Sequence, residues 1–179
     1  VDDLVGEQVI ESVLPAGGRK ARVVHVGKRG GCASTPQPFI ERLMVREALA
    51  GERVVRLKGG DPLVFGRAAE EMAALHAAGL EVIVVNGITS GLCAAAALGV
   101  SWTDRRCDAH GVLLVTGQCR PGVPGPDWAT IGRLAAGGTT VVIYMGLSRC
   151  AVLVSELRRS LPADWPAGTG ATRCASGNI

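Results

Sequence analysis

Short apolar runs and amphipathic stretches alternate along the first half of the chain. Apolar runs at residues 21–26, 53–57 and 82–85 predict strands, and the last is apolar on both sides, as in a buried parallel strand. Helices are expected over residues 38–49, 65–78 and 94–98. This alternation is typical of a parallel α/β sheet.

The pattern changes after Gly99, where polar residues cluster at 101–110. Strands are expected at residues 112–116 and 139–145, and helices near 127–136 and at 150–160. The fold class predicted is therefore α/β, with an N-terminal α/β domain at residues 1–103 and a C-terminal α/β domain at 104–179. Because an α/β sheet usually has more strands than either half supplies, we expect a fragment of a longer fold, incomplete at both termini.

Composition narrows the class of protein. A content of 47% hydrophobic and 20% charged residues excludes wholesale disorder. A net charge of +3 is too small for nucleic-acid or anionic-membrane binding by bulk charge. Residues 82–103 carry no charge, but turn sequences interrupt them, so we expect no membrane span. The six cysteines form no CxxC pair and favour a reducing cytoplasm, and His110 lacks the companions of a metal site.

Two glycine-containing turns follow predicted strands. Gly59, Gly60 and Asp61 end the second strand, where ligands bind in open α/β sheets and where glycines let the backbone approach a ligand. A turn capped by Asp61 explains the same residues equally well. In the second turn, residues 86–91, Thr89 or Ser90 could cap a helix or contact a ligand. Neither turn has the GxGxxG or GxxxxGK[ST] spacing of dinucleotide or P-loop sites.

Basic residues follow the first strand and the domain boundary. Lys28 is either a solvated loop charge or a partner for an anionic substrate. The adjacent Arg105 and Arg106 suit carboxylate recognition, because each guanidinium can pair bidentately, although solvated surface charge is an equal alternative.

Several motifs together resemble one family. These are VVRLKGGDPLVFGR with the following EE, GKR, the later Gln37, the GITS turn, VTG and IYMG. They are similar to the tetrapyrrole methylases, in particular to the members that methylate uroporphyrinogen III. The resemblance covers nearly the whole chain. It implies two α/β domains with the cofactor cleft between them, the first lacking its first strand and loop and the second its last strands.

The resemblance also implies an activity. It is S-adenosylmethionine-dependent C-methylation of uroporphyrinogen III to precorrin-2, in siroheme and cobalamin synthesis, by a cytoplasmic homodimer that needs no metal. Two alternatives stay open. One is a methylase of a later corrinoid precursor. The other is a non-catalytic remnant that acts as a binding module, favoured by Gln118 and Asp104 at positions where the family has His.

Roles for individual residues follow from the same resemblance. Asp2 matches the proposed proton acceptor and Lys28 the proposed proton donor. Arg29, Arg105 and Arg106 match substrate-binding positions. The cofactor-binding positions implied are Gly59, Gly60, Asp61, Val64, Thr89, Ser90, Met145 and Ala171.

Overall fold

The computed structural model describes residues 1–2, 4–13, 21–27, 35–107, 109–119 and 122–161. The chain divides into two compact units, Val1–Thr89 and Ser90–Ile179. This division lies closer to the N-terminus than the domain boundary expected after residue 103, which stays a prediction.

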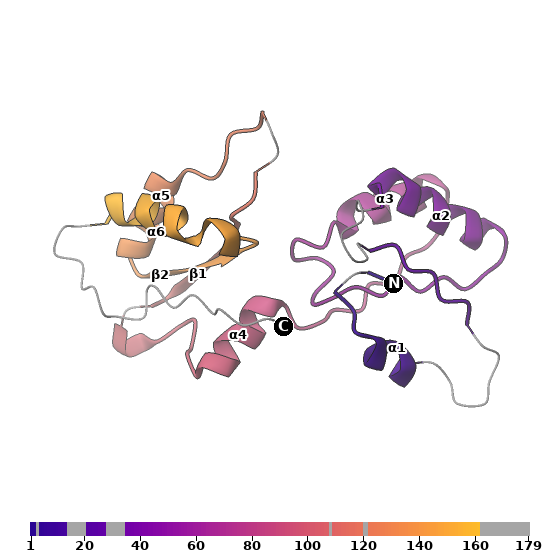
Figure 1. Cartoon of the computed structure of the whole chain (residues 1–179), viewed down its shortest axis with the longest axis horizontal. Helices are drawn as coiled ribbons and strands as arrows, with labels where there is room; N and C mark the ends of the chain where they lie inside the picture. Colours follow the sequence, from indigo (N-terminus) through magenta and orange to yellow (C-terminus); the bar gives the residue numbers. More distant parts are fainter. Residues whose placement is uncertain (3, 14–20, 28–34, 108, 120–121, 162–179) are drawn as a thin grey trace. The chain divides into compact units, whose positions relative to one another are not determined.

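The first unit is built on helices α1 (Glu7–Val13), α2 (Gln37–Leu49) and α3 (Ala68–Ala77). Helix α2 has a proline, Pro38, in its first turn, where the missing N–H costs nothing. Ile40 and Met44 lie one turn apart on its buried face and form a core cluster with Val26. Helices α2 and α3 pack side by side (Figure 1), and α2 confirms the helix expected there.

The strands expected in this unit are not formed by its described residues. The segments 21–26, 53–57 and 82–85 form neither helix nor strand. Isolated backbone bonds join two of them to the N-terminus, at 2.9 Å from Val26 N to Val1 O and 3.0 Å from Asp2 N to Leu57 O. In the segment predicted as a buried strand, residues 82–85, the side chains of Ile83, Val84 and Val85 are instead exposed, 90% in the case of Ile83. A strand needs a continuous ladder with a neighbour, and the few bonds to Val1 and Asp2 do not supply it.

The second unit contains a two-stranded parallel sheet of β1 (Gly111–Thr116) and β2 (Thr139–Tyr144). Both strands confirm the sequence prediction to within a residue at each end. Helix α5 (Trp128–Ala136) connects them, as a parallel pair requires, and packs on β2 and on α6 (Cys150–Arg159). Figure 1 shows α5 and α6 together beside the two strands.

Local capping explains where α5 begins. Asp127 Oδ1 accepts hydrogen bonds from the backbone N–H groups of Ala129 and Thr130 at 3.1 and 3.2 Å. These bonds satisfy backbone donors that have no partner inside the helix. The hydrogen bond from the Thr130 hydroxyl is the largest cause that lowers the pKa of Asp127, and the two backbone bonds lower it further.

Helix α4 (Ser90–Leu98) opens the second unit and begins earlier than the helix expected at 94. The short helices η1 (Arg105–Cys107) and η2 (Leu147–Arg149) complete the elements. In the part of the chain that the structure describes, no helix has the length and hydropathy that a bilayer crossing requires. Cys93 and Cys119 are free and exposed.

Candidate functional site

The Asp61 carboxylate joins the two glycine-containing turns of the first unit. Its Oδ1 accepts from the Leu63 N–H at 2.8 Å, and its Oδ2 accepts from the Gly87 N–H at 3.2 Å. Gly60 adopts a left-handed φ of 72°, and a side chain at Gly87 would collide with the Gly60 carbonyl oxygen. The two turns predicted as sites therefore form one continuous surface of backbone, with Thr89 buried at its end.

Backbone strain is concentrated in the same motifs. Among the described residues, Phe65, Arg67 and Met145 are the non-glycine residues with positive φ, at 53°, 57° and 54°. Between the first two, a Cβ on Gly66 would lie 2.5 Å from the Pro62 carbonyl oxygen. This left-handed segment delays α3 to Ala68, so the expected helix start at 65 was wrong. Such conformations cost about 1–3 kcal/mol each and persist where packing enforces them, often at functional sites.

The carboxyl ends of β1 and β2 meet through two glycines. Gly117 N donates to Tyr144 O at 2.7 Å, and a Cβ on Gly117 would lie 2.7 Å from Gly146 Cα. The fully buried Leu153 lies against both glycines. Met145 lies between Tyr144 and Gly146 and is 47% exposed, so its side chain is available to a ligand at this end of the sheet.

Tyr144 also reaches the first turn of α4. A Cβ on Gly91 would lie 2.5 Å from Tyr144 Oη, so the ring packs directly against that backbone. The exposed Ser90 precedes Gly91 and Met145 follows Tyr144. Tyr144 therefore links the part of the candidate cofactor site carried by Ser90 to the part carried by Met145.

Asp2, the expected proton acceptor, lies in a cluster of charges in the first unit. Arg56 Nη2 donates to Asp2 Oδ2 at 3.0 Å, and Lys58 Nζ lies 3.8 Å from the same oxygen. Both cations are largely buried, and both also bind the buried Glu71 of α3. Desolvation by burial is the main cause that lowers the pKa of the Val1 amino group beside this cluster.

Sequence reasoning assigned no role to the members of this cluster other than Asp2. Arg56 and Lys58 alternate on one extended segment, and this spacing puts both side chains on one side of it. Two cations at alternate positions of an apolar run are the signal from which a buried charged partner could have been predicted, but no such prediction was made. The partner itself, Glu71, could not be identified from spacing.

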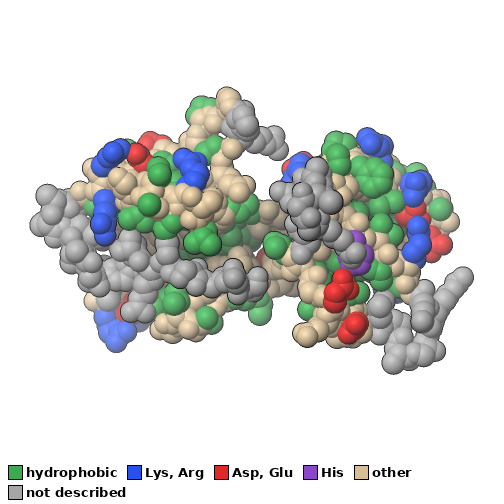
Figure 2. Space-filling view, viewed as in Figure 1, with side chains coloured by type: hydrophobic (Ala, Val, Ile, Leu, Met, Phe, Trp, Pro, Cys, Tyr) green, Lys and Arg blue, Asp and Glu red, His purple; other side chains and the backbone are tan. Residues whose placement is uncertain are grey.

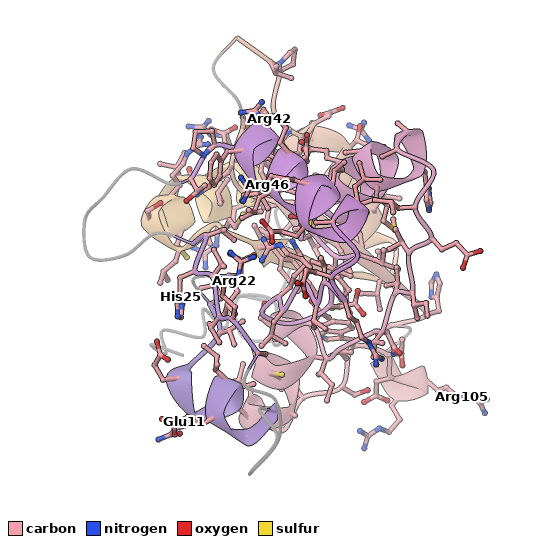
Figure 3. All side chains as sticks on the ribbon, turned by 90° about the vertical axis from the view of Figure 1, so that its right-hand side faces the viewer. Glu11, Arg22, His25, Arg42, Arg46 and Arg105 are labelled. Atoms are coloured by element: carbon pink, nitrogen blue, oxygen red, sulfur yellow. The ribbon has the colours of Figure 1, made fainter. Side chains whose placement is uncertain are left out.

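The expected substrate-binding arginines of η1 differ in their surroundings. Arg106 Nη2 and Nε bind the Asp104 carboxylate at 2.7 and 3.0 Å. This contact lowers the pKa of Asp104 to about 2, with the Arg106 side-chain hydrogen bond as the largest cause. Arg105 is exposed and projects from η1 toward solvent (Figure 3).

Other charged side chains of the first unit are paired on its surface. Glu47 of α2 binds Arg46 and Arg22, and the Arg46 hydrogen bond is the main cause that lowers its pKa. Figure 3 labels these arginines, and Figure 2 shows basic, acidic and hydrophobic side chains interspersed on the face drawn. Among the described residues, no group of three or more His, Cys, Asp or Glu side chains is placed to hold a metal ion.

Three expected site residues, Lys28, Arg29 and Ala171, lie outside the described residues. Val64 is half-buried and donates its backbone N–H to Asp61 O at 3.3 Å. In the first unit, the structure thus joins the turn that contains Gly59, Gly60, Asp61 and Val64 to the turn that contains Gly87. In the second unit, Tyr144 connects Ser90 with Met145.

Known proteins are similar to this chain in sequence and in fold. The chain is 48% identical over 157 residues to a uroporphyrinogen-III C-methyltransferase of Pseudomonas aeruginosa, covering 88% of this chain and 60% of that protein. It is 45% identical over 146 residues to a siroheme synthase of Tolumonas auensis, covering 82% of this chain and 30% of that protein. The chain therefore spans about 60% or less of these relatives' own length.

A solved structure has the same fold. It is a uroporphyrin-III C-methyl transferase of Thermus thermophilus complexed with S-adenyl homocysteine, with a TM-score of 0.66 and 39% identity. The match covers 89% of this chain and 62% of that chain, and it confirms the α/β fold class expected from sequence. The family model of the tetrapyrrole (corrin/porphyrin) methylases matches residues 2–172. Because this family model matches nearly the whole chain, the chain belongs to the tetrapyrrole methylases.

Proposed function

We propose that this chain is the methyl-transferring part of an enzyme that methylates uroporphyrinogen III at carbon to give precorrin-2. The observation that carries the proposal is the 48% identity to the uroporphyrinogen-III C-methyltransferase of Pseudomonas aeruginosa. The product would enter siroheme synthesis, in keeping with the siroheme synthase similarity, and cobalamin synthesis. The proposed enzyme is a cytoplasmic homodimer that uses neither nucleic acid nor a membrane.

The described residues fit S-adenosylmethionine as methyl donor. The joined turns offer backbone groups beside two glycines, and the exposed apolar side chains of Leu63 and Ile88 flank them. A nucleoside needs this combination of polar backbone and apolar surface. We propose that the donor is held by Gly59, Gly60, Asp61, Val64, Thr89, Ser90, Met145 and Ala171.

When bound, the donor supplies a sulfonium-activated methyl group for the nucleophilic carbon of a pyrrole ring. Because such a methyl group is already a good electrophile, positioning provides most of the rate enhancement. Asp2 is proposed to accept the proton that the ring must lose, and Lys28 to deliver a proton elsewhere on the ring. Arg29, Arg105 and Arg106 are proposed to bind the substrate's carboxylates.

Radiolabelled methyl transfer from S-adenosylmethionine to uroporphyrinogen III tests the function. The chain is assayed beside a version extended to the length of its relatives, each with Asp2→Asn as an inactive counterpart of nearly the same shape. Transfer that depends on Asp2 supports the proposal. No transfer by either version overturns it and favours the non-catalytic binding module. Transfer to a later corrinoid precursor alone overturns the substrate assignment.

A further inference from the structure

Four residues of the family-like motifs have no role in the function proposed above, and the structure brings three of them to the carboxylate of the fourth, Glu71. Glu71 of α3 accepts from Gln37 Nε2 at 3.1 Å and from Arg56 Nε at 3.2 Å, both at Oε1. Lys58 Nζ lies 3.3 Å from each Glu71 oxygen. Gln37 begins α2, so a helix start, an extended segment and α3 meet at this point.

Burial makes these contacts necessary. Gln37 and Glu71 are both buried, and only 7% of the Lys58 side chain is exposed. A buried carboxylate persists only when it is paired and hydrogen-bonded. Glu71 therefore holds its three donors in fixed places.

The two cations bound to Glu71 extend from it to Asp2. The guanidinium of Arg56 is rigid and planar, with Nε on Glu71 and Nη2 on Asp2 Oδ2 at 3.0 Å. Fixing its Nε edge therefore also fixes its Nη2 edge. Lys58 lies 3.8 Å from the same Asp2 oxygen.

We propose that Glu71 is a positioning residue, which holds Arg56 and Lys58 in the arrangement that orients the Asp2 carboxylate toward substrate. The proposal rests on the function proposed above, in which Asp2 accepts the ring proton. Gln37 supports the same arrangement from α2, because its amide is a further donor to Glu71.

Charge in this cluster gives the proposal a signature in pH dependence. Asp2 faces Arg56, Lys58, Glu71 and the amino group of Val1. In Glu71→Gln the carboxylate that holds Arg56 and Lys58 is lost, and the positioning role predicts that Arg56 Nη2 moves away from Asp2. Ionised Asp2 then loses a charge-assisted hydrogen bond, so the acidic limb of the kcat profile should move to higher pH. A misplaced carboxylate should also lower kcat, by about 10- to 100-fold, with the KM for S-adenosylmethionine nearly unchanged.

The variants are made in the protein extended to the length of its relatives. Glu71→Asp keeps the charge and should recover much of the activity. Gln37→Met has a side chain of similar size without the amide donor, and it should lower kcat a few-fold. It replaces Glu71→Gln as the test variant if Glu71→Gln does not fold. Glu70→Gln is the matched control, because Glu70 is the neighbouring glutamate on α3 and pairs with Arg67 at the surface.

A purely structural role gives a different result. If Glu71→Gln lowers thermal stability while kcat per folded molecule and the pH profile stay at wild-type values, the positioning role is overturned. A crystal structure of Glu71→Gln gives a readout independent of activity. Positioning predicts that Arg56 Nη2 leaves hydrogen-bond distance of Asp2, and an unchanged contact contradicts it. Absence of methyl transfer by the wild type would instead refute the proposed function and leave this structural result to decide the role of Glu71.

Discussion

Asp61 accepts a hydrogen bond from the backbone N–H of Gly87 at 3.2 Å, so one carboxylate joins two turns that lie 26 residues apart. The other oxygen of the same carboxylate holds the Leu63 N–H of its own turn. The acid of the GGDP motif thus has a structural role that does not require contact with a ligand.

Loss of the Asp61 carboxylate should loosen both turns. Asp61→Ala removes both acceptors, and we expect the Kd for S-adenosylhomocysteine to rise about tenfold or more, which corresponds to roughly 1.4 kcal/mol. Calorimetry measures the Kd, and amide exchange of Gly87 without ligand, expected to be faster, tests the turn itself. Asp127→Ala, which removes a comparable carboxylate from α5, serves as the control. Unchanged Gly87 exchange would contradict the structural role.

Met145 holds a left-handed conformation, with φ of 54°, that glycine adopts without strain. Met145→Gly should therefore be more stable than Met145→Ala by about 1 kcal/mol, measured by urea unfolding. Both variants should bind S-adenosylhomocysteine more weakly, because both lack the half-exposed side chain. Equal stability of the two variants would show that the backbone at this position relaxes.

Gly117 has no room for a side chain. The Cβ of Gly117→Ala would lie 2.7 Å from Gly146 Cα and 2.9 Å from Leu153 Cδ1, and backbone cannot move aside cheaply. We expect a loss of about 1–3 kcal/mol in the free energy of unfolding. Gly6→Ala is the control, since a Cβ there meets nothing within 4 Å and should cost little. If Gly117→Ala leaves the free energy of unfolding unchanged, the ends of the two strands separate readily.

The pKa of Asp104, about 2, depends first on the Arg106 side chain and then on the Arg106 backbone N–H. Arg106→Gln should raise this pKa toward the ordinary value of 3.8, as followed by carbon-detected NMR of the carboxyl group. Because folding depresses this pKa, ionised Asp104 stabilises the protein above about pH 3.8, and this contribution disappears as pH falls through about 2. An unchanged pKa in the variant would contradict the Arg106 contact.

The elements that were predictable from sequence are those whose backbone hydrogen bonds form within one helix or between two strands that both occur in the chain. Helix α2 has its buried Ile40 and Met44 one turn apart, and α5 has its cap in Asp127. Strands β1 and β2 have each other as partners. In contrast, Val55 and Ile83 lie in runs that read equally well as buried strands, yet they are exposed, because an apolar run does not specify which segment would pair with it.

The candidate site was predictable where its chemistry is local. Two glycines and an acid after an apolar run indicated Asp61 as a site residue. Helix α1, which was not predicted, has no comparable motif in its sequence. The contacts of Glu71 join residues 15 and 34 positions away, to Arg56 and Gln37, and only the folded chain brings them together. Sequence motifs identified these residues without revealing that they touch.

The burial of the Arg56–Glu71 contact also sets how it responds to ionic strength. Mobile ions screen charges that water surrounds, and they screen buried pairs far less. Arg106 and Asp104 are held by a solvent-facing contact, with 88% of the Arg106 side chain exposed, so that pairing weakens as salt is added. The Glu71 carboxylate, 5% exposed, keeps its cations in dilute and concentrated salt alike. Under the proposed function, the binding of substrate carboxylates by Arg106 therefore varies with ionic strength, whereas the arrangement of cations around Glu71 does not.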